Sequence, residues 1–173
     1  MTAPPAHLRI RPRGDGEQPA VRAVVRRAWY MAYAAIYTQG EMDAVFCGRI
    51  AQVAEWSERR SRPAGDLVAE ADGVIVGAAS LALLRDGDGE LVALYVLPEM
   101  QRLGIGGALW EAAADELRGR GCRRMWVWAL ERNPAALAFY RRRGCVDTEQ
   151  APFLLGTHSE PSLGMTLNLH APE

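Results

Sequence analysis

Short segments in which apolar residues alternate with polar ones, or run continuously, recur along the chain and are typical of β-strands. Seven segments have this pattern: 7–11, 66–71, 74–84, 90–96, 125–130, 145–149 and 165–170. Asp72-Gly73 separates the second from the third, and Asp-Gly between two β-rich runs is a strong hairpin signal. We therefore predict a β-hairpin over 66–84.

Four other segments repeat apolar residues at three- and four-residue intervals, the spacing of an amphipathic helix. They cover 20–36, 41–60, 104–120 and 134–143. The apolar face predicted for the second of these consists of Val45, Ile50, Val53 and Trp56. The stretch 150–164, between the last two strands, is predicted to be a long loop.

The order of these elements is β-α-α-β-β-β-α-β-α-β-β, and the length of 173 residues suits one domain over 1–173. The strand–helix–strand unit over 90–130 implies a parallel strand pair joined by a crossover helix, and the hairpin implies antiparallel neighbours. We therefore expect an α/β fold, with a central mixed sheet of about seven strands flanked by about four helices on both faces.

Composition and charge argue against several classes of function. Lys and Arg total 20 against 21 Asp and Glu, a net charge of −1, whereas proteins that grip nucleic acid usually carry a basic excess. No apolar run approaches the length of a membrane helix, and Met1–Ala6 carries no signal-peptide core. We expect a cytoplasmic protein without nucleic-acid or membrane partners.

Cysteine and histidine positions give no sign of a metal site or a disulfide framework. The chain has three widely spaced cysteines and no C-x-x-C, and its three histidines have no metal-ligand spacing. We expect reduced thiols and no bound metal.

The segment from 91 to 120 carries the clearest chemical signal: a strand, a proline-bounded turn, a glycine-rich stretch and an amphipathic helix. Backbone N–H groups at a helix N-terminus are unpaired and favour anions, and glycine lets a phosphate approach them. A Rossmann site is excluded because Leu109 stands where the third glycine is required. A P-loop is excluded because no Lys follows the glycines.

Two blocks of sequence resemble signatures of the GNAT N-acetyltransferase superfamily. Residues 101–106 read QRLGIG, which is similar to Q/R-x-x-G-x-G/A. Residues 133–145 read NPAALAFYRRRGC, which is similar to N-x-x-A-x-x-F-Y-x-x-x-G-F, with Cys145 at a packing position where Phe is usual. The blocks cover about a third of the chain, and the order of the remaining elements also matches. The resemblance implies the GNAT acyl-CoA N-acyltransferase fold.

The resemblance also implies acetyl-CoA as the acyl donor. The pantetheine arm would lie along the strand 90–96, where one backbone N–H polarises the thioester carbonyl, and the glycine-rich amides would bind the pyrophosphate. Asn133 would cap the last helix and bond the arm. The cofactor-binding residues expected on this basis are Leu94, Tyr95, Val96, Arg102, Leu103, Gly104, Ile105, Gly106, Gly107, Asn133 and Tyr140.

Two residues are candidates for catalysis. Tyr140 stands seven positions after Asn133, where the resemblance implies a tyrosine near the sulfur that donates a proton or a hydrogen bond to the leaving thiolate. Many relatives carry a Glu five residues before the Asn, but here that position is Trp128. Glu90 is the first substitute as general base, acting through water, and Glu131 the second. A solvated, non-catalytic residue is the alternative for both.

The aromatic residues could either bind the acceptor or pack in the core. Trp126 and Trp128 share one strand face; with Trp29, Tyr33 and Tyr37 they would wall an acceptor pocket, or else pack in the core. The resemblance places acceptor specificity in 20–60 and 150–164. An open, acidic groove would favour peptide acceptors, and a closed aromatic pocket would favour small amines.

The sequence therefore predicts an acetyl-CoA-dependent N-acetyltransferase, an acyltransferase that moves an acetyl group directly to a primary amine of a small molecule or peptide. Direct transfer is expected because neither motif offers a Cys or Ser nucleophile at a site position. The alternative is a CoA-binding sensor or catalytically silent GNAT-fold domain. The oligomeric state, a homodimer included, stays open.

Overall fold

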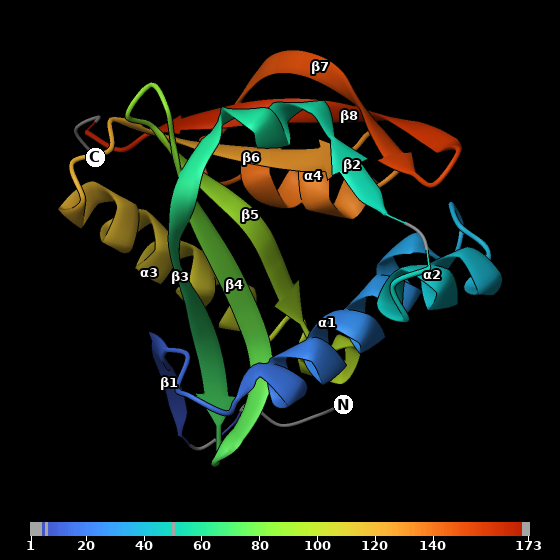
Figure 1. Cartoon of the computed structure of the whole chain (residues 1–173). Helices are drawn as coiled ribbons and strands as arrows, with labels where there is room; N and C mark the ends of the chain where they lie inside the picture. The colour runs from blue at the N-terminus through green and yellow to red at the C-terminus, as the bar shows by residue number, and fades with distance from the viewer. Residues whose placement is uncertain (1–4, 6, 50, 171–173) are drawn as a thin grey trace.

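The strands join in one mixed sheet, in the order β1-β3-β4-β5-β6-β8-β7-β2, in a computed structural model that describes residues 5, 7–49 and 51–170 (Figure 1). The strands are β1 (Leu8–Pro12), β2 (Gln52–Ala54), β3 (Arg60–Ala71), β4 (Val74–Leu84), β5 (Gly89–Val96), β6 (Arg124–Leu130), β7 (Val146–Leu155) and β8 (His158–Asn168). Only β5 and β6 pair in parallel among these strands. The predicted mixed sheet is confirmed, with one strand more than expected.

Helices cover both faces of this sheet, as predicted. They are α1 (Gln18–Tyr33), α2 (Gln39–Phe46), α3 (Ile105–Gly119) and α4 (Pro134–Arg141), with two short 3-10 turns, η1 (Glu55–Arg59) and η2 (Pro98–Met100). On β3, Val68 packs with Val21 of α1, whereas its neighbour Ala69 belongs to the core around α3. Alternate residues of a strand face opposite sides of a sheet, so α1 and α3 lie on opposite faces.

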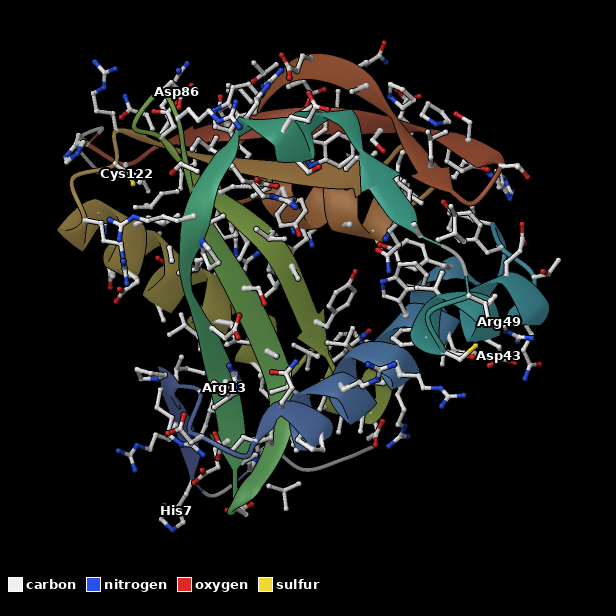
Figure 2. All side chains as sticks on the ribbon, viewed as in Figure 1. His7, Arg13, Asp43, Arg49, Asp86 and Cys122 are labelled. Atoms are coloured by element: carbon white, nitrogen blue, oxygen red, sulfur yellow. The ribbon has the colours of Figure 1, made fainter. Side chains whose placement is uncertain are left out.

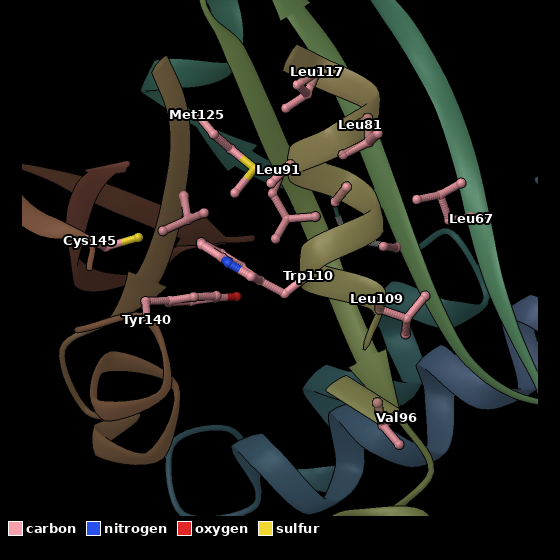
Figure 3. Packing of buried hydrophobic residues seen from close by; sticks show 14 of the residues in the cluster. Leu67, Leu81, Leu91, Val96, Leu109, Trp110, Leu117, Met125, Tyr140 and Cys145 are labelled. Carbon is pink, nitrogen blue, oxygen red and sulfur yellow. The ribbon is translucent and has the colours of Figure 1, made fainter. Parts of the chain in front are cut away.

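The core on the α3 side is the larger one. Leu109, Ala113 and Leu117 of α3 are fully buried against the sheet, and Trp110 fills the space toward α4 (Figure 3). The apolar residues predicted from their spacing therefore form the face that packs α3 against the sheet. This packing also sets the position of the α3 N-terminus.

The predicted hairpin is confirmed. β3 and β4 are antiparallel, and the turn residues Asp72 and Gly73 have φ values of 48° and 82°. Both central residues of a type I′ turn need positive φ, which Asp-Gly supplies at little cost.

The second helix is much shorter than predicted. α2 ends at Phe46, and Gly48 adopts a φ of 73°, a conformation that does not continue a helix. The chain then forms β2, which pairs with β7, and the turn η1, which carries Trp56. The prediction of a helix over 41–60 is therefore wrong beyond Phe46. Ile50, one of its predicted face residues, lies outside the described residues.

The predicted loop over 150–164 is also wrong, because β7 and β8 form a long hairpin there. Pro152 and Pro161, which lack a backbone N–H, occupy partner positions across this hairpin. Pro161 lies beyond the end of the β6 ladder, which stops at Leu130 paired with Ser162. Glu131 donates its N–H to the Pro161 carbonyl at 2.9 Å, and Pro161, which has no N–H to donate in return, ends the pairing with β6.

No helix in the described ranges is long and apolar enough to cross a membrane. Of the segment Met1–Ala6, only Pro5 is described.

Candidate active site

The parallel strands β5 and β6 separate after a short common stretch. Gly89–Leu91 pairs with Met125–Val127, and no later residue of β5 pairs with β6 among the described residues. On the other side of β5, Ser80 of β4 pairs with Ala93 and Leu81 pairs with Leu91, so Val92 forms a bulge. Bulges bend a strand, and this one marks the point where β5 turns away from β6 (Figure 1).

The separation leaves one edge of β5 without a strand partner. Leu94, Tyr95 and Val96 pair with Ala79, Ala78 and Gly77 of β4. Their other edge faces the gap between β5 and β6. The Gln101 side chain donates to the Val96 carbonyl there at 3.2 Å, and the absence of a strand partner leaves room for an extended ligand. This is the stretch along which the sequence predicted the pantetheine arm.

The glycine-rich segment connects β5 to an uncapped helix. Arg102 and Gly104 have φ values of 63° and 83°, and Gly104 occupies the N-cap of α3 without a side-chain cap. The first helical bond runs from the Ala108 N–H to the Gly104 carbonyl, at 3.0 Å. The N–H groups of Ile105, Gly106 and Gly107 therefore precede the helical ladder, an arrangement that favours a bound anion.

Arg143 adds a positive charge beside this helix end. Its guanidinium carbon lies 3.7 Å from the centre of the Phe139 ring, and a Cβ placed on Gly107 would be 2.8 Å from its Nη2. Burial lowers the pKa of this guanidinium below its ordinary value. The neighbouring Arg141 is instead paired with Asp147 at 2.7 Å.

The helix α4 carries the two predicted residues of the second block. Asn133 is its N-cap and accepts a hydrogen bond from the Ala136 N–H at 3.2 Å. Tyr140 lies in its last turn, and its ring packs against Trp110 of α3 with centroids 5.5 Å apart (Figure 3). Burial raises the pKa of the Tyr140 phenol, and the nearby Tyr33 adds to the effect. Tyr140 therefore holds its proton firmly.

Glu90 is buried rather than solvated. Its side chain is 2% exposed, and Arg60 donates to both carboxylate oxygens, from Nε at 2.8 Å and Nη2 at 2.7 Å. Both carboxylate oxygens of Glu90 are therefore bound by the single guanidinium of Arg60. Arg60 lies between Glu90 and the nearest cavity. Glu131 bonds Gln150 and does not line that cavity.

A cavity of about 270 Å³ opens on the α1 side of the gap between β5 and β6. Its wall includes seven aromatic side chains: Trp29, Tyr33, Tyr37, Trp56, Tyr95, Trp128 and Phe153. Side chains of α1, β2 and β5 extend into the space between these elements (Figure 2). Val92 and Tyr95 line the cavity as well as belonging to the separated part of β5, so the two regions are continuous.

The predicted aromatic residues divide between wall and core. Trp29, Tyr33, Tyr37 and Trp128 line the cavity, but Trp126 does not. Trp126 is 6% exposed and donates its indole N–H to Asp88 at 3.2 Å.

Other wall residues could not be identified from the sequence. Trp56, which stacks on Trp128 at 4.0 Å, stood inside a predicted helix, and Phe153 and Ser162 stood inside a predicted loop. Arg60 lay at the end of that same predicted helix. The only indication of these wall residues in the sequence was the family resemblance, which placed acceptor specificity in 20–60 and 150–164, where they lie.

Cys145, the last residue of the sequence block 133–145, has a buried and unreactive thiol. Burial raises the pKa of Cys145 to about 12. Among the described residues, no group of three His, Cys, Asp or Glu side chains is arranged to hold a metal ion.

Comparison with known proteins agrees with this geometry. The chain is 38% identical over 92 residues to the uncharacterized N-acetyltransferase YuaI of Bacillus subtilis (strain 168), covering 50% of this chain and 51% of that one. It is 43% identical over 98 residues to the mycothiol acetyltransferase of Actinosynnema mirum, covering 51% of this chain and 32% of that one. The chain thus spans about half or less of the length of these relatives.

A solved structure shares the fold along nearly the whole chain. The PaiA N-acetyltransferase of Thermoplasma acidophilum, crystallised with coenzyme A, superposes with a TM-score of 0.74 at 18% identity, covering 94% of this chain and 99% of that one. The sequence model of the acetyltransferase (GNAT) family matches residues 24–145. The chain therefore belongs to the acetyltransferase (GNAT) family.

Proposed function

We propose that this protein transfers an acetyl group from acetyl-CoA to a primary amine of a small molecule. The observation that carries the proposal is a continuous path of three parts. An uncapped, glycine-rich N-terminus of α3 would bind the pyrophosphate, the free edge of β5 would bind the pantetheine arm, and the aromatic cavity would receive the acceptor. In this arrangement the thioester lies where β5 meets the cavity.

Transfer would be direct. The amine nitrogen attacks the thioester carbonyl carbon, a C–N bond forms, and the carbonyl oxygen becomes an oxyanion. One backbone N–H among Leu94, Tyr95 and Val96 would stabilise this charge, an effect of about 3 kcal/mol where one such donor has been removed in other enzymes. The C–S bond then breaks, the sulfur gains a proton and the nitrogen loses one. The high pKa of the buried Cys145 supports direct transfer over an acyl-thiol intermediate.

Tyr140 would assist the departing thiolate. A thiol has a pKa near 8.5, so its thiolate leaves readily, whereas the raised pKa of Tyr140 makes its phenol a reluctant acid. We therefore assign Tyr140 a hydrogen bond to the departing sulfur, and the thiolate takes its proton from solvent.

A small acceptor fits the site better than a peptide. Roughly 300–1,000 Å³ is usual for small-molecule pockets, so a cavity of about 270 Å³ holds one compact molecule. Its wall, as described, is aromatic and contains no carboxylate, the opposite of an acidic groove for a cationic peptide.

The base role of Glu90 stays a prediction, and its contacts favour a different role. Arg60 donates to both carboxylate oxygens of Glu90, so Glu90 cannot reach the amine without displacing that residue. The acceptor amine would lose its proton to solvent. We propose that Glu90 positions Arg60.

The test is formation of free coenzyme A from acetyl-CoA with a panel of primary amines, with the acetylated product identified by mass. We expect equimolar thiol and N-acetyl product with at least one small amine. Coenzyme binding without turnover on any small amine or peptide would favour the catalytically silent alternative. Turnover on peptides alone would remove the small-molecule assignment. A cytoplasmic location belongs to the same proposal, and a homodimer stays a prediction.

A further inference from the structure

Gly164 of β8 lies directly against Trp128, a residue of the cavity wall. The two residues pair across the ladder between β6 and β8. A Cβ placed on Gly164 would be 2.7, 2.8 and 2.9 Å from Cη2, Cζ2 and Cζ3 of the Trp128 ring. Because these three neighbouring ring atoms are at nearly equal distances, the ring lies face-on over Gly164. Carbon atoms in contact are usually about 3.5–4.0 Å apart, so an alanine here would overlap the ring.

The opposite face of this ring is covered by Trp56. The two indoles are parallel within 7° and their centres are 4.0 Å apart, too close for the chain at Gly164 to lie between them. Trp126 lies beside Trp128, parallel within 16° at 6.2 Å, and is held by its hydrogen bond to Asp88. A displacement of Trp128 away from β8 is therefore directed toward Trp56.

Such a displacement would change the acceptor cavity. Trp56 and Trp128 both line it, and Trp128 is partly exposed, so a ligand in the cavity can touch its ring. Gly164 is buried and is not a wall residue. The ring would have to move by roughly 1 Å to relieve the overlap with an alanine. In a cavity of about 270 Å³, a shift of two aromatic side chains removes room for part of a ligand.

We propose, resting on the transfer proposed above, that Gly164 is a positioning residue for the acceptor. Because it has no side chain, Gly164 lets Trp128 lie flat against β8, and this position of Trp128 sets the width of the acceptor cavity. Gly164 does not touch the acceptor and acts only through Trp128. It thereby determines which amines fit by size, and it has no role in coenzyme binding.

The experiment compares kcat and KM of the wild type and Gly164→Ala. The probes are the amines of the panel, extended by ethylamine, butylamine and hexylamine, which differ only in length. We expect Gly164→Ala to raise the KM for hexylamine by about tenfold, the effect of one methylene in an apolar pocket, and the KM for ethylamine far less. The loss should grow with the size of the amine, kcat should change less than KM, and the KM for acetyl-CoA should stay the same.

Trp128→Leu shows whether Gly164 acts through the indole. Leucine is too short to reach over Gly164, so it tolerates an alanine there. In the Trp128→Leu background, Gly164→Ala should therefore change the KM for hexylamine by less than about twofold, which makes the two substitutions strongly non-additive. Trp128→Leu alone widens the cavity and should raise the ratio of kcat/KM for hexylamine to that for ethylamine, a result that does not require Gly164→Ala to fold.

Gly89→Ala is the matched control. A Cβ on Gly89 would lie 2.7 Å from the Leu117 side chain of α3, so this variant overfills the core to a similar degree on the sheet face opposite the cavity. It should lower the Tm, as overpacking does, and leave the KM of every amine at its wild-type value.

Equal losses on ethylamine and hexylamine in Gly164→Ala, or no loss on either, would overturn the inference. So would a tenfold effect of Gly164→Ala that persists in the Trp128→Leu background, or an unchanged size preference in Trp128→Leu alone. In each of these cases the wild type still releases free thiol, so the proposed transfer stands. If the wild type releases thiol with no amine, the proposed transfer itself fails.

Discussion

Tyr140 is deeply buried and lies near Tyr33, a residue of the cavity wall. Its ring packs on Trp110, and its hydroxyl is the group that the proposed mechanism needs. Removing only the hydroxyl keeps the packing, so Tyr140→Phe separates chemistry from structure.

For Tyr140→Phe we predict a fall in kcat of about 10²-fold, the lower end of the loss when one hydrogen-bond donor to a developing negative charge is removed. The Kd for acetyl-CoA, measured by calorimetry, should hardly change, because the ring stays in place. Tyr30→Phe removes a hydroxyl that bonds Asp43 outside the cavity and serves as the control. An unchanged kcat in Tyr140→Phe would exclude Tyr140 from the mechanism.

Glu90→Gln distinguishes a positioning residue from a base. Gln cannot offer Arg60 two charged acceptors, and loss of a charge-assisted hydrogen bond costs about 2 kcal/mol. For a chain of this size we expect a Tm about 4–8 °C lower. In the positioning account, the acid limb of the kcat/KM profile keeps its midpoint.

A base role predicts otherwise: the acid limb would flatten or move to higher pH in Glu90→Gln. That outcome, with Tm unchanged, would contradict the positioning assignment. Glu131→Gln is the control, since Glu131 is partly exposed and lies off the cavity wall.

At the scale of elements, the start of α3 depends on two glycines that differ in what they tolerate. Gly104 has a φ of 83°, where a side chain costs about 1–2 kcal/mol. Gly106 is helical, and a Cβ there would meet Phe139 at 3.5 Å, an ordinary contact. One position therefore requires glycine and the other does not.

We predict that Gly104→Ala weakens acetyl-CoA binding, because the N–H groups that follow it move out of line. Gly106→Ala should retain binding and stability. Calorimetric titration of both variants checks this. Equal affinities in the two variants would contradict an anion site at this helix end.

The hairpin β7–β8 is joined to α2 by an ionic contact. His158 Nδ1 lies 3.0 Å from Glu41, and Nε2 lies 2.9 Å from Glu160. The bond to Glu41, followed by that to Glu160, raises the pKa of His158 above its usual 6.5. The Thr38 backbone N–H, followed by His158, lowers the pKa of Glu41 below 4.5.

This cluster predicts a pH-dependent stability. A raised histidine pKa stabilises the fold fully below the unfolded value of 6.5 and ceases to do so as pH rises through the folded value. The Glu41 contribution is present above 4.5 and lost as pH falls through its lower folded value. His158→Gln should therefore destabilise most between these two values.

Urea unfolding at about pH 5.5 and about pH 8.5 measures the effect. The loss of stability in His158→Gln should be clear at the lower pH and small at the higher one. His170→Gln, at an exposed position near the C-terminus, should show neither. A loss that is equal at both pH values would rule out a protonated His158 in this contact.

Local patterns predicted the elements that carry strong signals. The Asp72-Gly73 hairpin, the apolar face of α3 and the cap of α4 at Asn133 follow from short-range rules. β2 was not predicted, because the apolar residues from Val45 to Trp56 have the spacing of a helix. The β7–β8 hairpin was not predicted, because Pro152 and Pro161 are typical of loops. Both segments are strands because β2 and β7, which are distant in sequence, pair with each other.

At the scale of the whole molecule, β5 connects the two halves of the proposed reaction. Its C-terminal end leads into α3, its free edge faces the gap, and Val92 and Tyr95 reach the acceptor cavity. The donor half could be predicted because it depends on backbone near two motifs. The acceptor half could be predicted only in part. Trp29, Tyr33, Tyr37 and Trp128 were candidates, but the other wall residues were not, since only the folded sheet brings them together.

The central claim is that acetyl-CoA binds along the path from α3 to the cavity. Thermal unfolding with and without the coenzyme tests it most directly. At about one hundred times Kd, binding should stabilise the protein by about 2.7 kcal/mol. This corresponds to a rise in Tm of roughly 5–11 °C for a chain of this length. No rise at millimolar acetyl-CoA would contradict the account.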